Sequence, residues 1–374
     1  MQNPEFQSCS SFTRREFVTT VAAATVGMSA GLPALARAAE QSTPKRQIKL
    51  GLDNFAVRAW SYNASQLIDY AASLKTDSLF ITDLKPFENF KDDYLGDLRK
   101  KAADQGLQIH LGSWSICPTS KAFKPDWGTA EEHLALGIRM AKALGSPVFR
   151  VILGTREDRK TEGGIDARIA DTVKVCKSQR SRAIDAGVKI AVENHAGDMQ
   201  AWELVNLIEE AGKEYVGANL DSGNACWTLE DPLESLETLG PYALTSSLRD
   251  SMVWETPRGA KVQWTAMGEG CVDLKAYFDR FAALCPGVPV HIETISGFAN
   301  EIPYLDAGFW TAFPRARARD FARFVALAKR GKAIQPFKVP EGKDRKEAEK
   351  EYQKAELEHS LAYCKRVLGL GLRS

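Results

Sequence analysis

The amino-acid sequence predicts an α/β protein built as a closed (β/α)8 barrel with a helical extension at its C-terminus. Short apolar runs alternate with amphipathic segments eight times, as expected for parallel strands joined by helical crossovers. Eight units favour closure over a doubly wound open sheet, and no G-x-G-x-x-G motif follows the first run. We assign residues 47–331 to this TIM barrel and residues 332–374 to a helical tail packed on it.

The first 40 residues have the composition of an export segment and are left out of the predicted fold. Arg14 and Arg15 precede a mild apolar run, Phe17–Leu35, that is diluted by threonine, serine and glycine. This pattern resembles a twin-arginine export signal, with small residues before Ala39 as a cleavage site. A weak membrane anchor is the alternative. We therefore expect residues 1–40 to be removed and the mature protein to be periplasmic or secreted.

The predicted barrel strands are short apolar runs that each end in polar residues. They cover residues 48–55, 78–84, 107–114, 147–154, 188–195, 216–223, 243–250 and 289–296. Between them lie segments such as 130–145 and 201–212, whose apolar residues recur at spacings of three and four, as on one face of a helix.

Signals at the predicted helix ends agree with this alternation. Thr129 and Glu132 have the spacing of a capping box at the start of one helix. Asp231 followed by Pro232 places an N-cap before a proline at the first helical position. Gly145 stands where a left-handed C-cap is needed before the next strand.

The C-terminal tail contains a charged segment, residues 341–372, that predicts a further helix. Its apolar stripe consists of Leu357, Leu361, Cys364 and Leu368. Packing of this stripe against the barrel is the preferred interpretation, and a contact in a homo-oligomer is the alternative.

The bulk composition limits the class of partner. Lys and Arg total 49 against 48 Asp and Glu, so the net charge of +1 gives no broad attraction for nucleic acid or an anionic membrane. After the first 40 residues, no segment is apolar and long enough to span a bilayer. A small neutral or weakly charged ligand is the expected partner.

Polar residues gather at the C-terminal ends of the last four predicted strands, which is where a barrel of this kind carries its active site. Side chains alternate along a strand, so Glu193 and His195 share one face, as do His291 and Glu293. The full set is Glu193, His195, Asp221, Asn224, Ser247, Arg249, Asp250, His291 and Glu293.

Three carboxylates at one barrel mouth require a neutralising charge, because their mutual repulsion is costly in a buried site. Carboxylates and imidazoles are ligands for manganese, magnesium, zinc and cobalt. A structural network of ion pairs is the alternative, with Arg249 as the clearest cation nearby and Arg150 as a second.

Several tryptophans fall in or near the loops after the predicted strands, where indoles often stack on sugar rings. They are Trp60, Trp114, Trp127, Trp254 and Trp264.

Several motifs resemble those of the xylose-isomerase-like sugar phosphate isomerases and epimerases, over Gln47 to Gly331. They are "VENHAG", "DSGNACWTLEDPLESLETLGPYA", "SLRD", "GEGCVDLKAYFDRF" and "IETISG", in that order. The resemblance implies a single divalent metal held after the fifth, sixth, seventh and eighth strands. Three of the four implied ligands are present as Glu193, Asp221 and Glu293.

The fourth implied ligand is a histidine in an H-x-K-D segment, and this chain has Ser247 in its place. A hydroxyl is a poor ligand for a divalent cation compared with imidazole. His195, His291 or water could complete the shell, or Arg249 could balance the carboxylates without a metal. We expect one divalent ion, manganese or magnesium rather than zinc, because the remaining ligands are carboxylates.

Members of the resembled family remove a proton next to a carbonyl and return it elsewhere through an enediolate, which implies an exported sugar isomerase or epimerase here. Glu193 and Glu293 are the expected catalytic carboxylates and His195 the orienting or proton-donating group. Asn224, Arg249 and His291 would hold substrate hydroxyls. Two alternatives remain: a 3-keto-glycoside lyase that expels an aglycone after the same first step, and a non-catalytic carbohydrate-binding barrel.

Overall fold

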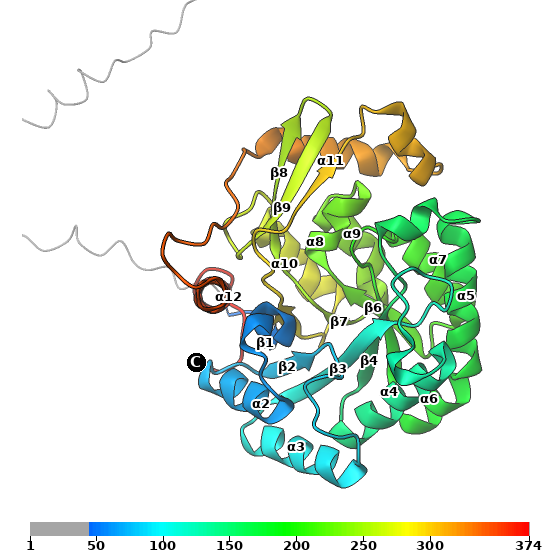
Figure 1. Ribbon diagram of the computed structural model, residues 1–374, viewed down its shortest axis with the longest axis vertical. Coiled ribbons are helices and arrows are strands. Elements are labelled where there is room, and N and C mark those ends of the chain that lie inside the picture. The colour runs from blue at the N-terminus through cyan, green and yellow to red at the C-terminus, as the bar shows by residue number, and fades with distance from the viewer. Residues whose placement is uncertain (1–44, 374) are drawn as a thin grey trace, which may run out of the picture. The chain divides into compact units, whose positions relative to one another are not determined.

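The computed structural model describes residues 45–373 (Figure 1). The predicted export segment, residues 1–40, lies outside these described residues. Eight parallel strands occur in the order β10-β1-β2-β3-β4-β5-β6-β7. They are β1 (Leu50–Asp53), β2 (Ser78–Ile81), β3 (Gln108–Ser115), β4 (Val148–Ile152), β5 (Lys189–Glu193), β6 (Val216–Leu220), β7 (Ala243–Ser246) and β10 (Val290–Ile292).

The barrel closes between the end of β7 and β10. Leu248 forms a parallel bridge with Ile292. The Leu248 amide donates to the carbonyl of His291 at 2.7 Å, and the Glu293 amide donates to the carbonyl of Leu248 at 3.0 Å. The eight-stranded (β/α)8 TIM barrel predicted from the sequence is therefore confirmed, and the open-sheet alternative is wrong.

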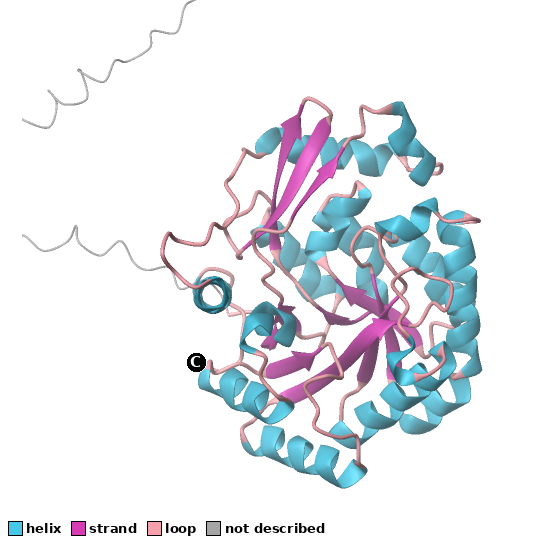
Figure 2. Cartoon of the chain, viewed as in Figure 1, coloured by secondary structure: helices cyan, strands magenta, loops and turns pink. Residues whose placement is uncertain are grey.

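Helices surround the strands on the outside of the barrel (Figure 2). Thr129 and Glu132 form the predicted capping box, and Asp231 caps the helix that Pro232 begins. Gly145 adopts the predicted left-handed C-cap with φ of 73°. The outer helices are α2 (Ala64–Ser73), α3 (Asp92–Asp104), α4 (Ala130–Leu144), α5 (Gly164–Ser178), α6 (Arg180–Ala186), α7 (Ala201–Ala211), α9 (Pro232–Leu239) and α10 (Leu274–Leu284).

Short helices occupy several loops at the C-terminal ends of the strands. These loops matter because they carry side chains to the barrel mouth. The short helices are η1 (Asn54–Trp60), η2 (Pro125–Trp127), η3 (Arg156–Lys160), α8 (Ser222–Ala225), η4 (Cys226–Thr228), η5 (Gly240–Tyr242) and η6 (Ala307–Ala312).

A second, antiparallel sheet was not predicted from the sequence. It contains β8 (Asp250–Thr256), β9 (Gly259–Thr265) and β11 (Ala299–Ile302), in the order β11-β9-β8, and α11 (Ala318–Arg330) packs on β8. The sheet and this helix share a separate apolar core that includes Val253, Val262 and Phe324. Figures 1 and 2 show these elements at the top of the molecule, beyond the barrel strands.

The C-terminal helix α12 (Arg345–Arg366) lies along the barrel beside η1, β1 and β10. Leu357, Leu361, Cys364 and Leu368 are all buried, and they join the same apolar core as the barrel strands. The Trp60 indole N–H donates to the carbonyl of Lys350 at 3.1 Å. The predicted helical extension is thus packed on the barrel, in agreement with the predicted fold class.

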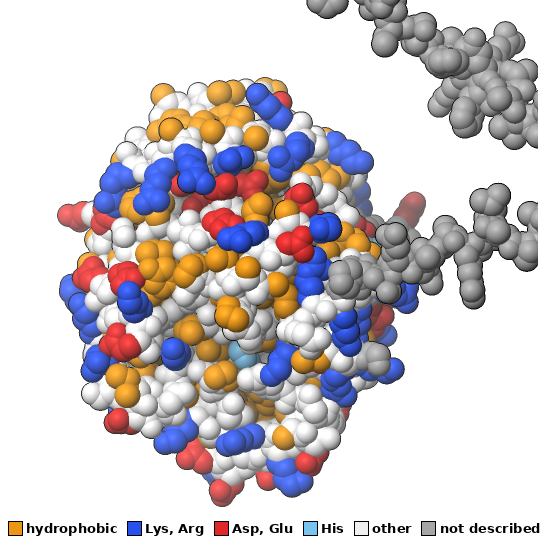
Figure 3. Space-filling view, turned by 180° about the vertical axis from the view of Figure 1, so that it is seen from behind, with side chains coloured by type: hydrophobic (Ala, Val, Ile, Leu, Met, Phe, Trp, Pro, Cys, Tyr) orange, Lys and Arg blue, Asp and Glu red, His pale blue; other side chains and the backbone are white. Residues whose placement is uncertain are grey.

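Basic and acidic side chains are both scattered over the face shown in Figure 3, with hydrophobic side chains among them. This distribution agrees with the nearly balanced charge of the chain. Within residues 45–373 there is no helix whose length and apolar character would let it cross a membrane.

Candidate active site

The candidate active site is a cavity of about 480 Å³ at the C-terminal ends of the barrel strands. A volume of this size is typical of pockets that bind small molecules. Charged and polar side chains from different strands and the loops after them converge on it. They include Thr82, Ser113, Arg150, Glu193, His195, Asn224, Arg249 and Glu293.

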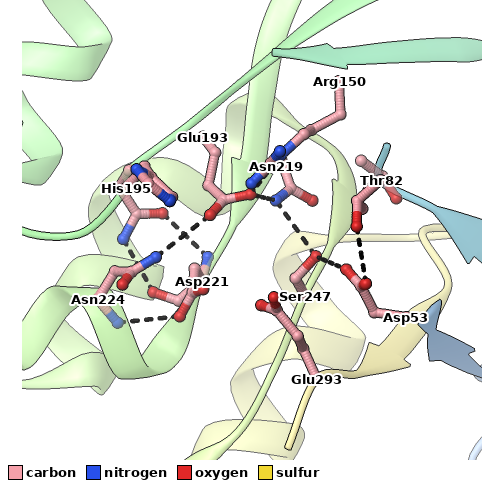
Figure 4. A network of polar contacts seen from close by, with 12 residues as sticks. Asp53, Thr82, Arg150, Glu193, His195, Asn219, Asp221, Asn224, Ser247 and Glu293 are labelled. Carbon is pink, nitrogen blue, oxygen red and sulfur yellow. Dashed lines mark hydrogen bonds and ion pairs between the residues drawn. The ribbon is translucent and has the colours of Figure 1, made fainter. Parts of the chain in front are cut away.

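Glu193 ends β5 and is held by three donors from neighbouring strands and loops. Its Oε2 accepts from Arg150 Nε at 2.6 Å and from Asn219 Nδ2 at 2.5 Å. Its Oε1 accepts from Asn224 Nδ2 at 3.2 Å. Figure 4 shows Glu193 among these side chains, with Glu293 approaching from another strand. The parallel register explains the first contacts, because Glu193 pairs with Asn219 of β6 and Arg150 of β4 lies beside Ala191.

The charge of Glu193 is set by competition between burial and its partners. Burial raises the pKa of this carboxyl, but the Arg150 guanidinium and neighbouring groups outweigh that effect and hold the pKa below its usual value. Glu193 is therefore ionised at neutral pH and is able to accept a proton.

His195 follows β5, and only one of its two ring nitrogens has a hydrogen-bond partner among residues 45–373. Its Nδ1 lies 2.7 Å from the carbonyl oxygen of Gly154, and a carbonyl only accepts, so Nδ1 carries the proton and Nε2 is the basic nitrogen. Burial lowers the pKa of His195 to about 4 despite the nearby Glu193. The imidazole is therefore neutral at pH 7 and lines the cavity together with Trp114, whose ring centroid is 5.3 Å away.

Asp221 and Glu293 converge on Arg249. The Nη2 of Arg249 donates to a carboxylate oxygen of each, and the Arg249 side chain is only 2% exposed. Asp221 also caps the short helix α8 by accepting from the amides of Gly223 and Asn224 at 2.8 and 2.9 Å. One guanidinium thus joins the ends of β6 and β10.

The carboxyls beside Arg249 retain protons more strongly than Glu193 does. Burial raises the pKa of Asp221 to about 7, although Arg249 opposes this shift. Burial likewise raises the pKa of Glu293 well above its usual value against the effect of Arg249. Two carboxyls that line one cavity, Glu193 and Glu293, are therefore shifted in opposite directions, as in a pair made of one base and one acid.

Ser247 contacts a carboxylate that sequence reasoning missed. Its Oγ donates to Asp53 Oδ2 at 3.0 Å, and Thr82 Oγ1 donates to Asp53 Oδ1 at 2.9 Å. Asp53 and Asn219 were not among the predicted site residues. Asp53 closes the first strand in the same way as Glu193 closes the fifth, so the acidic residue at that strand end was the available signal.

His291 does not reach the cavity. It precedes Glu293 by two residues, so it shares the inward face but lies about 7 Å deeper in the barrel. Its Nδ1 donates to the carbonyl of Ser246 at 3.0 Å, and its ring packs 5.0 Å from the rings of His110 and Phe80. The structure therefore does not support the predicted contact between His291 and a substrate.

The predicted metal site does not match the arrangement of its residues. Glu193 turns toward Arg150, whereas Asp221 and Glu293 both bind Arg249. In the part of the chain that the structure covers, no group of three or more His, Cys, Asp or Glu is placed to hold a metal ion. The Arg249 guanidinium contacts two of the three predicted metal ligands, Asp221 and Glu293, and the third, Glu193, accepts from Arg150.

Aromatic side chains form much of the remaining cavity wall. Trp227 and Trp264 stack with centroids 4.4 Å apart and an interplanar angle of 12°. Of the tryptophans singled out in the sequence, Trp114, Trp127 and Trp264 line the cavity, whereas Trp60 and Trp254 do not. The aromatic lining consists of Phe55, Trp114, Trp127, Trp227, Trp264 and Phe298.

Comparison with known proteins identifies a matching family model and several similar folds. A model described as "Xylose isomerase-like TIM barrel" matches residues 68–308. A D-psicose 3-epimerase solved in the presence of D-fructose aligns with a TM-score of 0.56 at 15% identity, over 86% of this chain and all of the other. A D-psicose 3-epimerase with D-tagatose, from Clostridium cellulolyticum H10, gives 0.53 at 15% identity, over 84% and 98%.

A third structure, the IOLI protein with a bound zinc atom, gives a TM-score of 0.53 at 16% identity, over 77% of this chain and all of the other. No protein of curated function matches the chain in sequence. At 15–16% sequence identity, these similarities show that the chain shares the fold of these structures and show nothing about its activity.

Proposed function

This chain belongs to the xylose isomerase-like TIM-barrel family, and from that premise we propose that it is an isomerase or epimerase of a sugar or sugar derivative. The observation that carries the proposal is that Glu193 and Glu293 line one cavity and have pKa values shifted in opposite directions, down for Glu193 and up for Glu293. Solved structures with the same fold include sugar epimerases, which supports a carbohydrate as the small-molecule substrate.

In the proposed reaction Glu193 takes a proton from the carbon next to the substrate carbonyl. The electron pair of that C–H bond forms a carbon–carbon double bond, and the carbonyl oxygen becomes an oxyanion. Glu293, whose pKa burial raises, returns a proton to the same carbon from the other side or to its neighbour. Return to the same carbon gives an epimer. Return to the neighbour gives an isomer, because the hydroxyl proton of the first carbon then passes to the oxyanion and a carbonyl forms on the first carbon.

The remaining polar groups of the cavity position the substrate. Asn224 already donates to Glu193, and its Oδ1 has no partner among residues 45–373, so it is available to a hydroxyl. His195 presents its free Nε2 to the cavity beside Glu193 and accepts a hydrogen bond from a substrate hydroxyl. Both groups would orient the carbon whose proton is removed.

A second candidate function, elimination from a 3-keto-glycoside, is favoured by the aromatic wall. Trp227 is half-buried, lines the cavity and stacks on the buried Trp264, and neither indole N–H has a partner within the described residues. A glycoside with a ring-bearing aglycone would use such a wall. After the same proton removal, the bond from carbon to the aglycone oxygen would break, and the aglycone would leave with a proton.

Deuterium incorporation and product analysis test the proposal. The purified mature protein is incubated in D2O with ketoses, aldoses and 3-keto-glycosides, and the products are identified by NMR. We expect deuterium at the carbon next to the carbonyl of an epimerised or isomerised sugar. Release of a free aglycone would favour the lyase, and binding without any exchange across the panel would favour a non-catalytic carbohydrate-binding barrel.

We further propose that the protein acts outside the cytoplasm, on the basis of Arg14 and Arg15 before the run Phe17–Leu35. Replacing both arginines by lysine should retain the full-length chain in the cytoplasm, measured by fractionation and immunoblotting. A matched control replaces Lys45 and Arg46, which follow the proposed cleavage site, and should leave export unchanged. Normal export of the double-lysine variant would contradict the proposal.

A further inference from the structure

Arg249 is held in the site by contacts to both its backbone and its side chain. Its amide donates to Ser222 Oγ at 3.0 Å, and the same hydroxyl donates to the Arg249 carbonyl at 2.6 Å. The guanidinium carbon lies 4.3 Å from the ring centroid of Trp264, a favourable cation–π distance. These contacts fix the direction of a side chain that otherwise has many rotamers.

The neighbouring backbone leaves just enough room for this arrangement. A Cβ on Gly223 would come within 2.6 Å of both Cγ and Cδ of Arg249, so any larger residue there would displace the side chain. Gly223 lies in α8 and directly follows Ser222 in the chain. Ser222 in turn follows Asp221, the carboxylate that Arg249 contacts. The turn after β6 therefore provides the carboxylate, the hydroxyl and the space that Arg249 needs.

The guanidinium still has unused donors. Nη2 serves Asp221 and Glu293, whereas Nε and Nη1 are buried and have no partner in residues 45–373. A buried donor without a partner costs free energy, so the site is more stable when a ligand oxygen accepts from it. Arg249 also lines the cavity that contains Glu193 and Glu293.

We infer that Arg249 takes the place of a divalent metal in this site, as a permanent cation between Asp221 and Glu293 that also binds an oxygen anion of the substrate. The second half of this inference rests on the proposed function, because the oxyanion forms only when a proton leaves the carbon beside the carbonyl. A guanidinium stays charged at every accessible pH and donates charge-assisted hydrogen bonds to such an oxygen. Donors aimed at developing charge in a site shielded from water lower the barrier most effectively.

The residue at the fourth implied ligand position agrees with this inference. Ser247 donates its hydroxyl proton to Asp53 and belongs to a hydrogen-bond network with that carboxylate. The sequence therefore departs from the implied metal site in two linked ways: an imidazole is absent, and a guanidinium binds two of the three implied carboxylate ligands.

Metal titration of variants tests the inference without any need for a substrate. Wild-type protein is stripped with chelator and titrated with Mn²⁺ by calorimetry, and we expect no binding below millimolar concentrations. The Arg249→Ala variant leaves Asp221, Glu193 and Glu293 around an empty space and should bind Mn²⁺ at least about tenfold more tightly than wild type. The Arg249→Lys variant keeps a positive charge and is the matched control, which should not gain metal binding.

A second substitution shows whether the new affinity arises in this site. Adding Asp221→Asn to Arg249→Ala should abolish the gain, because it removes one of the carboxylate ligands. Binding of Mn²⁺ by wild type at micromolar concentration would overturn the inference, as would failure of Arg249→Ala to bind more tightly than Arg249→Lys. Circular dichroism verifies that each variant is folded. If Arg249→Ala is not folded, the titration of wild type with Mn²⁺ tests the inference by itself.

Chelator treatment of wild type separates this inference from the proposed function. If deuterium still exchanges into a substrate after chelator treatment, the result supports both the proposed function and the role of Arg249. If exchange requires added Mn²⁺, the proposed function stands and the role of Arg249 is overturned. If no substrate exchanges under any condition, the proposed function fails, whereas the metal titrations still test the position of Arg249.

Discussion

Replacing Glu193 by glutamine is expected to lower kcat at least about 100-fold, the usual contribution of a positioned general base. Glutamine keeps an oxygen that can accept from Arg150, but an amide cannot take a proton from carbon. Glu293→Gln should lose a similar factor, because the amide cannot return a proton. Substrate conversion and deuterium incorporation are measured for both variants and for wild type.

The control for these variants is Glu210→Gln, which changes an exposed glutamate of α7 and should leave kcat unchanged. Circular dichroism establishes that all three proteins are folded. Turnover within about tenfold of wild type in both site variants would exclude Glu193 and Glu293 from proton transfer.

The same base should set the acid side of the pH profile. Burial raises the pKa of Glu193, but Arg150 and neighbouring groups hold it below the usual 4.5, so the ionised form persists as the pH falls through 5. Protonation removes the base, and kcat/KM should therefore decline only below about pH 4.5. Arg150→Met removes the main lowering influence and should move this decline to higher pH.

Arg159→Met is expected to lower the free energy of unfolding by about 3–5 kcal/mol, because it leaves a buried carboxylate unpaired. Arg159 donates to both oxygens of Glu203, at 2.7 and 2.9 Å, and both side chains are at most 3% exposed. It also donates to the carbonyls of Asp198 and Ala312 at 2.6 and 2.7 Å. These bonds link η3 to the loop that carries His195, and urea denaturation measures their loss.

An exposed ion pair provides the comparison. Arg319→Met removes a contact to Glu234 from an arginine that is 75% exposed and should change the free energy of unfolding by less than about 1 kcal/mol. Adding Glu203→Leu to Arg159→Met should recover part of the loss, since no charge then remains unpaired. Equal effects of Arg159→Met and Arg319→Met would show that the buried pair does not stabilise the fold.

Local patterns in the sequence were sufficient to predict the barrel. The alternation of apolar runs with helical segments identified all eight strands, and the caps at Thr129 and Asp231 form as predicted. These features depend on residues close together in the chain, so their physical causes can be read from short windows. The pairing of β11 with β9 has no local signal, because it spans the intervening α10 and β10, whereas the hairpin of β8 and β9 is local and was not recognised.

The strand ends also pointed to most of the candidate site. Glu193, Asp221 and Glu293 follow parallel strands, so their convergence follows from the topology of a barrel. Strand periodicity assigns His291 to the same face as Glu293, but it carries no information about depth, and the lower layer of the barrel is packed with other side chains.

The sequence by itself thus determined the barrel, its helical extension and three of the carboxylates at its mouth, although not Asp53. Only the tertiary structure showed that the guanidinium of Arg249 contacts two of them, Asp221 and Glu293. Arg249 has a long side chain that could point to solvent or inward, and its direction depends on the indole of Trp264 from β9 and the missing side chain at Gly223 in α8. Those groups approach Arg249 from separate elements, so their combined effect exists only once the chain has folded.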